Sequence, residues 1–211
     1  MIAEAAHEIG LDGLTLRAVA DRLGVSIAAL YHHVSGKEDL LRLAAEESTR
    51  AVPLPVDEGQ HWAQWLCDWA HYNHDVFAAQ PGLLEQYMGG AVALQDVVRN
   101  LDRILDVLAR EGFEVRDANA AYSLVSSCAI GAVVGEHWEA AAAHQDGEFA
   151  TAFRRVVAAA PRGELSRVRQ LAKSKRPSRR DSLDRRIDIV LKGIAAEYGL
   201  TWQPVTHPPA R

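Results

Sequence analysis

The chain has 211 residues, 48% of them hydrophobic, and a formal net charge of −5. This composition fits a globular protein of one or two domains with a substantial core. No unbroken apolar run approaches the roughly 18 residues of a membrane span, and no signal region follows Met1. We therefore expect a cytoplasmic protein with no membrane partner. Cys67 and Cys128 lie far apart in sequence, and we expect both to be reduced core thiols.

Charge is unevenly distributed along the chain. Residues 1–50 hold five basic and eight acidic side chains (net −3), and residues 51–161 hold six and fifteen (net −9). Residues 162–180 hold eight basic and one acidic side chain (net +7). Outside that last tract there is no basic footprint, so any contact with nucleic acid must depend on local placement of cations.

The first predicted helix covers residues 2–9, and residues 15–41 follow it with the pattern of two short helices joined by a tight turn. Residues 16–23 place apolar side chains on one helical face. Gly24 ends this helix because glycine tolerates a positive φ, and Ser26 caps the next helix, residues 26–34. Two short helices joined by a glycine-containing turn form a helix-turn-helix.

The outward face of the second short helix indicates what the motif contacts. Its side chains are small, apolar or hydrogen-bonding, and such a helix fits the major groove of DNA. Tyr31, His32 and His33 are able to donate to phosphate oxygens. Lys37 lies at the start of the next helix, residues 36–50, beside free backbone N–H groups that favour a phosphate. The alternative is that these helices form only a packed core, although Tyr31, His32 and Lys37 serve no obvious packing purpose.

Residues 2–45 closely resemble the TetR family of bacterial repressors, through GLTLR at 13–17, LGVS at 23–26, LY at 30–31 and KE at 37–38. The resemblance implies that the residues at the DNA are Arg17, Ser26, Ile27, Ala28, Ala29, Tyr31, His32, His33 and Lys37. Because Ile27, Ala28 and Ala29 carry no polar group, they are expected to touch thymine methyls, with Ser26 or His32 supplying polar readout. Family members commonly carry a basic arm before the first helix, whereas this sequence starts almost at that helix.

The remaining elements predict a second helical domain. Pro53 and Pro55 form a stiff linker, and helices are expected over 57–80, 83–88, 93–110, 117–144, 148–159 and 182–198. The helix at 117–144 is capped by Asp117 and apolar on nearly all sides, so it should be buried on two faces. We pair it with the 182–198 helix in a homodimer interface, as the family usually dimerises. Residues 161–181 are expected to be a solvated loop, with contact to DNA phosphates as the alternative, and residues 201–211 a frayed tail.

Aromatic side chains of the second domain are the candidates for a ligand site. They favour a flat, largely apolar effector, and ordinary core is the alternative. The candidates are Trp65, Trp69, Tyr72, Tyr87, Tyr122 and Trp138.

No catalytic residues, metal ligands or cofactor are predicted. The sequence contains no G-x-S-x-G elbow, glycine-rich phosphate loop or H-E-x-x-H zinc helix. His71 and His74 lie near Asp68 and Asp75, but we place His71, Asp68 and Asp75 with Gln64 on a wet helix face, where a metal site would be exposed and incomplete.

The sequence therefore predicts an all-α protein. An N-terminal three-helix helix-turn-helix DNA-binding domain, residues 1–50, precedes a C-terminal helical ligand-binding and dimerisation domain, residues 51–200. The expected function is that of a repressor released from a palindromic, double-stranded DNA operator by a small effector. The alternatives are a helical small-molecule-binding protein or enzyme that uses the C-terminal bundle, and a co-regulator that binds protein.

Overall fold

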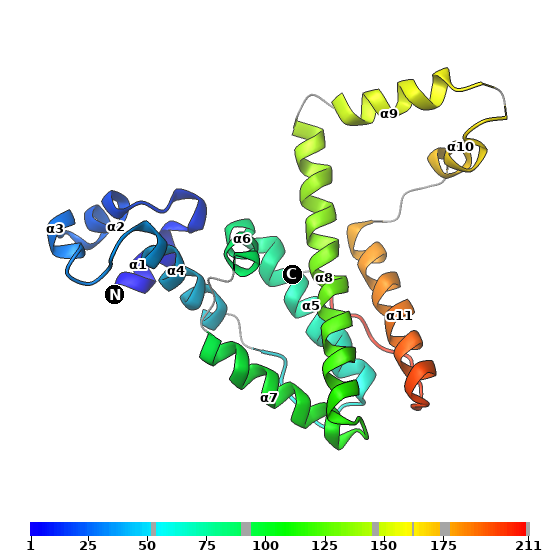
Figure 1. Ribbon diagram of the computed structural model, residues 1–211, viewed down its shortest axis with the longest axis horizontal. Helices are drawn as coiled ribbons and strands as arrows, with labels where there is room; N and C mark the ends of the chain where they lie inside the picture. Colours follow the sequence, from blue (N-terminus) through cyan, green and yellow to red (C-terminus); the bar gives the residue numbers. More distant parts are fainter. Residues whose placement is uncertain (52–53, 90–93, 145–147, 162, 174–177, 210–211) are drawn as a thin grey trace.

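The computed structural model describes residues 1–51, 54–89, 94–144, 148–161, 163–173 and 178–209, and the described residues are all-α, as the sequence predicts. Figure 1 shows the N-terminal helices at one end of the molecule and a helical bundle in the middle, with α9 and α10 projecting from the far end. The N-terminal unit consists of α1 (Ile2–Ile9), the 3₁₀ turn η1 (Leu11–Gly13), α2 (Leu16–Leu23), α3 (Ile27–Leu30) and α4 (Lys37–Ala51).

Local signals set the ends of the helix-turn-helix. The Thr15 hydroxyl accepts from Ala18 N, and Gly24 ends α2 in the left-handed region, with φ 69°. The Ser26 hydroxyl then accepts from Ala29 N at the start of α3. α3 is shorter than the predicted 26–34, because His32 N and His33 N donate to the carbonyls three residues back and the chain tightens into turns.

A compact apolar core fixes these helices on α4. Side chains from every helix of the unit contribute, and a hydrogen bond between His7 Nδ1 and the buried Ser48 Oγ (2.8 Å) ties α1 to α4. The core consists of Ala5, Ala6, Leu14, Val19, Ala20, Leu30, Val34, Leu40 and Ala44. α1, α2 and α3 are therefore held on α4 by one shared core.

The bundle is built from α5 (Trp62–Ala79), α6 (Pro81–Met88), α7 (Leu94–Arg110), α8 (Val115–His144) and α11 (Arg179–Tyr198). α6 is a complete helix with a proline in its first turn, longer than the single turn predicted for 83–88. α8 begins two residues before Asp117, so that residue lies in the first turn and is not the cap. α11 begins at a capping box, in which Ser178 and Asp181 satisfy each other's backbone N–H groups. Of the predicted Pro53–Pro55 linker, Pro53 lies outside the described residues.

α8 has a length and an apolar composition that are also found in membrane-spanning helices. By length and composition alone, Val115–Ala141 is apolar enough to cross a membrane, although the sequence has no unbroken apolar run of that length. The core helix of a water-soluble protein passes the same test. Here α8 packs against α5, α7 and α11, which accounts for its apolar side chains within the bundle.

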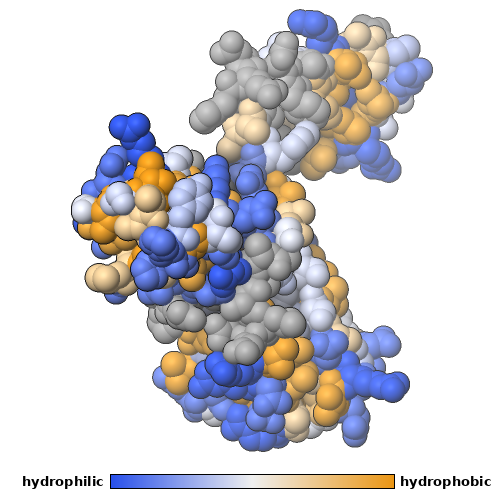
Figure 2. Space-filling model, turned by 60° about the vertical axis from the view of Figure 1, so that its left-hand side comes forward, coloured by the Kyte–Doolittle hydropathy of each residue, from blue (hydrophilic) through white to orange (hydrophobic). Residues whose placement is uncertain are grey.

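Helix α10 and the first turn of α11 occupy much of the range 161–181, where a solvated loop was expected. α9 (Glu148–Ala159) matches the prediction, but α10 (Ser166–Lys173) was not predicted, and α11 starts at Arg179. The centre of the basic tract, 174–177, lies outside the described residues. Figure 1 places α10 far from α3 within the chain, which argues against a DNA contact by the same protomer. Figure 2 shows apolar side chains gathered on this projecting part, where Phe153, Val156, Leu165 and Leu171 are exposed.

The C-terminal tail corrects the expectation of a frayed end. It runs back from α11 along the bundle (red in Figure 1), and Trp62 Nε1 donates to the Thr201 carbonyl at 3.2 Å. Gln64 makes two hydrogen bonds with the backbone of Thr206, at 2.9 and 2.8 Å. The tail therefore covers the face of α5 that we expected to be wet, and His71 on that face is buried, with 2% exposed.

Candidate functional site

The surface of α3 carries the side chains predicted to read DNA. Leu30 is buried and fixes the helix from behind, whereas Ile27 is 41% and Tyr31 54% exposed. The remaining predicted contacts, Arg17, Ser26, Ala28, Ala29, His32, His33 and Lys37, are exposed as well. Their backbone positions are fixed by the two caps and by the core beneath. The structure thus brings all nine predicted residues onto the exposed surface of the α2–α4 unit.

Charge on this surface is set by which cations have carboxylate partners. Arg22 pairs with Glu8, and Arg42 pairs with Asp39 and Glu46 at 3.1 and 2.8 Å. These pairs neutralise Arg22 and Arg42, so local positive charge on this surface depends on cations such as Arg17 and Lys37. Arg17 has only a long contact with Asp21, 3.8 Å, and is 83% exposed.

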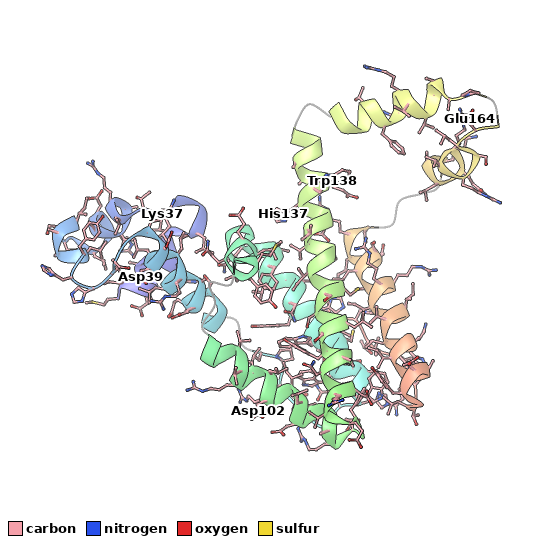
Figure 3. The ribbon with its side chains drawn as sticks, viewed as in Figure 1. Lys37, Asp39, Asp102, His137, Trp138 and Glu164 are labelled. Carbon is pink, nitrogen blue, oxygen red and sulfur yellow. The ribbon has the colours of Figure 1, made fainter. Side chains whose placement is uncertain are left out.

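Lys37 and Asp39 mark the start of α4 in Figure 3. The backbone N–H and hydroxyl of Ser35 both donate to the Asp39 carboxylate, at 2.9 and 2.6 Å. The Ser35 hydroxyl bond is the first cause that lowers the pKa of Asp39 to about 2, followed by the Ser35 N–H and Arg42. Asp39 therefore closes the turn that leads from α3 into α4 and holds Lys37 at an exposed helix N-terminus.

Four of the six predicted ligand residues form one aromatic cluster, defined here as Trp65, Trp69, Tyr72 and Tyr122. The Trp65 and Trp69 rings are parallel within 5°, with centroids 5.9 Å apart. Trp69 also contacts Tyr72 (5.4 Å) and Tyr122 of α8 (5.5 Å). Residues 65, 69 and 72 are spaced by four and three along α5, so they share one helix face. The aromatic cluster joins α5 to α8.

Polar groups lie within this apolar surround. Trp69 Nε1 donates to Ser126 Oγ at 2.9 Å, whereas Trp65 Nε1 is buried and has no hydrogen-bond partner among the residues that the structure describes. Burial raises the pKa of the Tyr72 and Tyr122 hydroxyls, so both stay neutral donors. Sequence reasoning did not single out Ser126, because a serine within a line of small residues on α8 gives no distinct signal. A buried aromatic surface with a few fixed polar groups is the usual composition of a small-molecule site.

The other two predicted ligand residues lie outside the aromatic cluster. Tyr87 is 42% exposed and contacts Phe77 at 5.2 Å, near enough to Tyr122 to contribute to its raised pKa. Trp138 is 56% exposed and lies further along α8, towards α9 (Figure 3). Tyr87 therefore lies at the edge of the aromatic cluster, and Trp138 does not belong to it.

A small apolar cluster, which we call the joint, connects the N-terminal unit to the bundle. Ala45 of α4 packs there against the end of α5, against α6 and against α8, through Val76, Phe77, Leu83, Leu84 and Val133. Tyr72 packs against both the joint and the main core. The aromatic cluster and α4 are therefore connected by continuous packing.

His74 bridges α5 and α8 beside the joint, away from His71. Its ring nitrogens contact the carboxylates of Asp75 (3.0 Å) and Glu136 of α8 (3.1 Å). The hydrogen bond to Asp75, with Glu136 second among the favourable contacts, raises the pKa of His74 against the opposing effect of burial. His71 instead faces Asp184 of α11 at 3.3 Å, so the two histidines contact different carboxylates, and the burial of His71 contradicts the exposed position on which the sequence reasoning relied.

Comparison with known proteins identifies the N-terminal unit. The family model of bacterial regulatory proteins of the tetR family matches residues 2–44. A transcriptional regulator of the helix-turn-helix type from Saccharopolyspora erythraea is 31% identical over 150 residues, 69% of this chain and 62% of that protein. The class C tetracycline repressor of Escherichia coli is 30% identical over 151 residues, 69% of this chain and 67% of that protein.

The chain spans 62% and 61% of the lengths of the S. erythraea regulator and of the class A tetracycline repressor of E. coli. Among solved structures, the TetR family protein ActR of Streptomyces coelicolor, in complex with actinorhodin, has a TM-score of 0.72 at 20% identity, with 94% of this chain and 96% of that chain covered. That likeness extends over both the N-terminal unit and the bundle. On these sequence and structural relationships, the chain belongs to the TetR family of transcriptional regulators.

Proposed function

We propose that this protein is a cytoplasmic, ligand-responsive repressor that binds a palindromic operator in double-stranded DNA. The observation that carries the proposal is the surface of α3, where two helix caps and a buried Leu30 hold the exposed Ile27 and Tyr31 in place. A short helix exposed in this way fits the major groove, with phosphate contacts from Tyr31 and Lys37 setting its orientation.

The proposed homodimer forms through α8 and α11. Both helices expose apolar side chains, including Leu124 (52%) and Val134 (44%) of α8 and Ile189 (60%) of α11. Gly131 and Gly193 are exposed on the same two helices and have no heavy atom near an added Cβ, which allows a partner helix to approach closely. A two-fold dimer places two α3 helices about 34–36 Å apart, one turn of DNA, on a palindromic site.

Effector binding is proposed at the aromatic cluster. The buried Trp65 N–H has no acceptor within the described part of the chain. A ligand that offers an acceptor there therefore removes the free-energy cost of an unpaired donor. In related folds, ActR is in complex with actinorhodin and a TetR variant of Acinetobacter baumannii is in complex with minocycline. These two compounds are therefore the first probes for the aromatic cluster.

Release from DNA is proposed to pass through the joint. A ligand that spreads α5 from α8 changes the packing around Ala45, and α4 carries the whole helix-turn-helix with it. Only a ligand that binds the released arrangement more tightly than the DNA-bound one shifts the equilibrium. The expected outcome is a changed distance between the two α3 helices of the dimer.

The DNA-binding part is tested by titrating the purified protein against its own upstream DNA at two salt concentrations. We expect tight binding that weakens steeply as salt rises, and loss of binding in Tyr31→Ala. Tyr87→Ala is the matched control, because Tyr87 is an exposed tyrosine on α6 and does not belong to the predicted DNA-contacting surface of α3. Equal binding by wild type and Tyr31→Ala would show that α3 does not read DNA.

The ligand-binding part is tested with Trp65→Phe, which keeps an aromatic ring and removes the N–H. We expect this variant to fold and to bind DNA as the wild type does, because no hydrogen bond is lost. Release of DNA by actinorhodin or minocycline should require about tenfold more compound if the N–H donates to it, which corresponds to about 1.4 kcal/mol. An unchanged response to a compound that releases the wild type would place the ligand elsewhere.

A further inference from the structure

A second cluster of chemically reactive side chains lies on the opposite side of α5 from the aromatic cluster. Gln64 fixes the backbone of Thr206 with hydrogen bonds of 2.9 and 2.8 Å. These bonds place the next residue, His207, over the seam between α5 and α11. Cys67 and His71, one helical turn apart on α5, face it from below.

Four potential metal-binding atoms converge at this seam. His207 Nδ1 lies 3.4 Å from Cys67 Sγ and 3.1 Å from His71 Nε2. The Asp184 Oδ1 atom of α11 lies 3.3 Å from His71 Nε2 and 3.5 Å from His207 Nδ1. The sulfur and the ring nitrogens of Cys67, His71 and His207 all lie within 4.8 Å of one another.

The orientation of the His207 ring directs a lone pair into this cluster. Its Nε2 lies 3.2 Å from Asp188 Oδ1, and a carboxylate only accepts, so Nε2 carries the hydrogen. The lone pair of the neutral ring is then on Nδ1, facing Cys67 and His71. A histidine that donates to a carboxylate through one nitrogen and offers the other to the centre is the usual arrangement around a bound metal.

Hydrogen bonding within the chain does not satisfy these groups. Cys67 and His71 both approach the single lone pair of His207 Nδ1. Among the described residues, buried Asp184 Oδ1 has no hydrogen-bond partner and only an ion pair with Arg180 Nε at 3.5 Å. His71 Nδ1 is also buried without a hydrogen-bond partner in the described ranges, so either neutral tautomer of His71 leaves one buried ring nitrogen unpaired there. Buried polar groups are normally satisfied, and exceptions of this kind require an explanation.

We propose that Cys67, His71, Asp184 and His207 bind a zinc-class divalent metal ion that fastens the C-terminal tail to α5 and α11. Zinc takes cysteine, histidine and carboxylate ligands in a tetrahedron, with bonds of about 2.0–2.3 Å, so donor atoms should lie roughly 3.3–3.7 Å apart. Four of the six separations between donor atoms run from 3.1 to 3.5 Å. The donor atoms of Cys67, His71 and His207 lie within 4.8 Å of one another, so binding the ion requires these side chains to close in around it.

Some neighbouring charges weaken binding of a metal cation and others strengthen it. The Arg180 guanidinium lies 3.5 Å from Asp184 and opposes a cation, whereas Asp184, Asp188 and a Cys67 thiolate favour one. Burial raises the pKa of the Cys67 thiol to about 12, so metal binding must release the thiol proton to solvent as the S–metal bond forms. Burial also lowers the pKa of His71 to about 3, which keeps the ring neutral and able to bind a metal.

The proposed site does not depend on DNA binding and is tested on the tag-free full chain. The protein is stripped with a chelator, dialysed, and titrated with Zn²⁺ and with Co²⁺ as a spectroscopic substitute. We expect one metal ion per chain, the intense visible bands of tetrahedral cobalt, and a near-ultraviolet thiolate-to-cobalt band. Zinc should also raise the midpoint of thermal unfolding.

His207→Ala is the decisive variant, because the residue lies on the tail and its removal leaves the bundle core intact. We expect affinity for Zn²⁺ to fall at least about 100-fold in His207→Ala, and Cys67→Ser to lose the thiolate band. His137→Ala, at an exposed histidine of α8 (Figure 3), is the matched control and should bind as the wild type does. Failure of the wild type to bind zinc, equal affinity in His207→Ala, or a cobalt complex without a thiolate band would each overturn the proposal.

Discussion

The substitution Ser126→Ala removes the hydroxyl that accepts the Trp69 N–H at 2.9 Å. Trp69 is 5% and Ser126 9% exposed, so the freed donor stays buried within the aromatic cluster. A buried donor that has lost its acceptor lowers the free energy of unfolding by about 1–3 kcal/mol. Alanine is favoured over serine within a helix by about 0.5 kcal/mol, so the net loss of stability should be about 0.5–2.5 kcal/mol.

Two further variants separate the hydrogen bond from other effects. Ser127→Ala, at an exposed position one residue along α8, supplies the helix-propensity gain without the buried donor, and it should be slightly more stable than wild type. Trp69→Phe keeps an aromatic ring against Trp65 but has no N–H that could lose its acceptor. In that background Ser126→Ala should cost less, because only the hydrogen bond between Ser126 and Tyr122 is then lost, which gives a coupling energy of about 1–2 kcal/mol between positions 69 and 126.

The measurement is urea unfolding followed by tryptophan fluorescence and circular dichroism. All variants are compared at one protein concentration, because the proposed dimer makes stability depend on concentration. If Ser126→Ala and Ser127→Ala are equally stable, water reaches the Trp69 N–H and the aromatic cluster is open to solvent. That result would refute the closed packing on which the estimate depends.

Three further predictions concern the N-terminal unit and its link to the bundle. Lys37→Ala should lower the slope of log K against log salt for DNA binding by about 0.9 per protomer, and an unchanged slope would remove Lys37 from the phosphate contacts. Because contacts with Asp75 and with a carboxylate of α8 raise the pKa of His74, its stabilisation is present below about pH 6.5 and is lost as pH rises through the folded-state pKa. Urea unfolding should therefore show wild type exceeding His74→Gln in stability by more at about pH 6 than at about pH 9, and a constant difference would contradict this reasoning. Gly24→Ala places a side chain at φ 69° and should lower the unfolding free energy by about 1–2 kcal/mol. Gly36→Ala, where φ is not positive and no heavy atom lies near an added Cβ, should not share that loss.

The N-terminal unit was predictable because its determinants are local. Gly24 and Ser26 act within three residues of the helix ends that they define, and the structure shows both in the expected place, whereas the cap that Thr15 provides for α2 was not predicted. The aromatic cluster was partly predictable for the same reason, since the spacing of Trp65, Trp69 and Tyr72 fixes them on one face of α5. Tyr87 and Trp138 were grouped with them by residue type alone, and the structure places one at the edge and the other outside.

The errors fall where contacts between distant residues decide the structure. His71 was assigned to a wet face because α5 alone is polar there, but the tail and α11 cover it. His207 is 136 residues away from His71, and no spacing rule connects a histidine in a proline-containing tail with a helix of the bundle. α10 was missed because a stretch rich in basic residues, without a buried residue, resembles a solvated loop.

α5 connects the features that carry the two proposals. One face of the helix carries Cys67 and His71 under the tail, another carries Trp69 against α8, and its end packs at the joint against Ala45. Close-packed interiors transmit a shift of one helix to its neighbours, so metal binding under the tail and ligand binding at the aromatic cluster should influence each other. Thermodynamic linkage makes that influence reciprocal. If zinc changes the affinity for an effector by some factor, the effector must change the affinity for zinc by the same factor. The test is to titrate effector with and without zinc, and zinc with and without effector. If the two affinity ratios differ, the two titrations do not report on the same equilibrium.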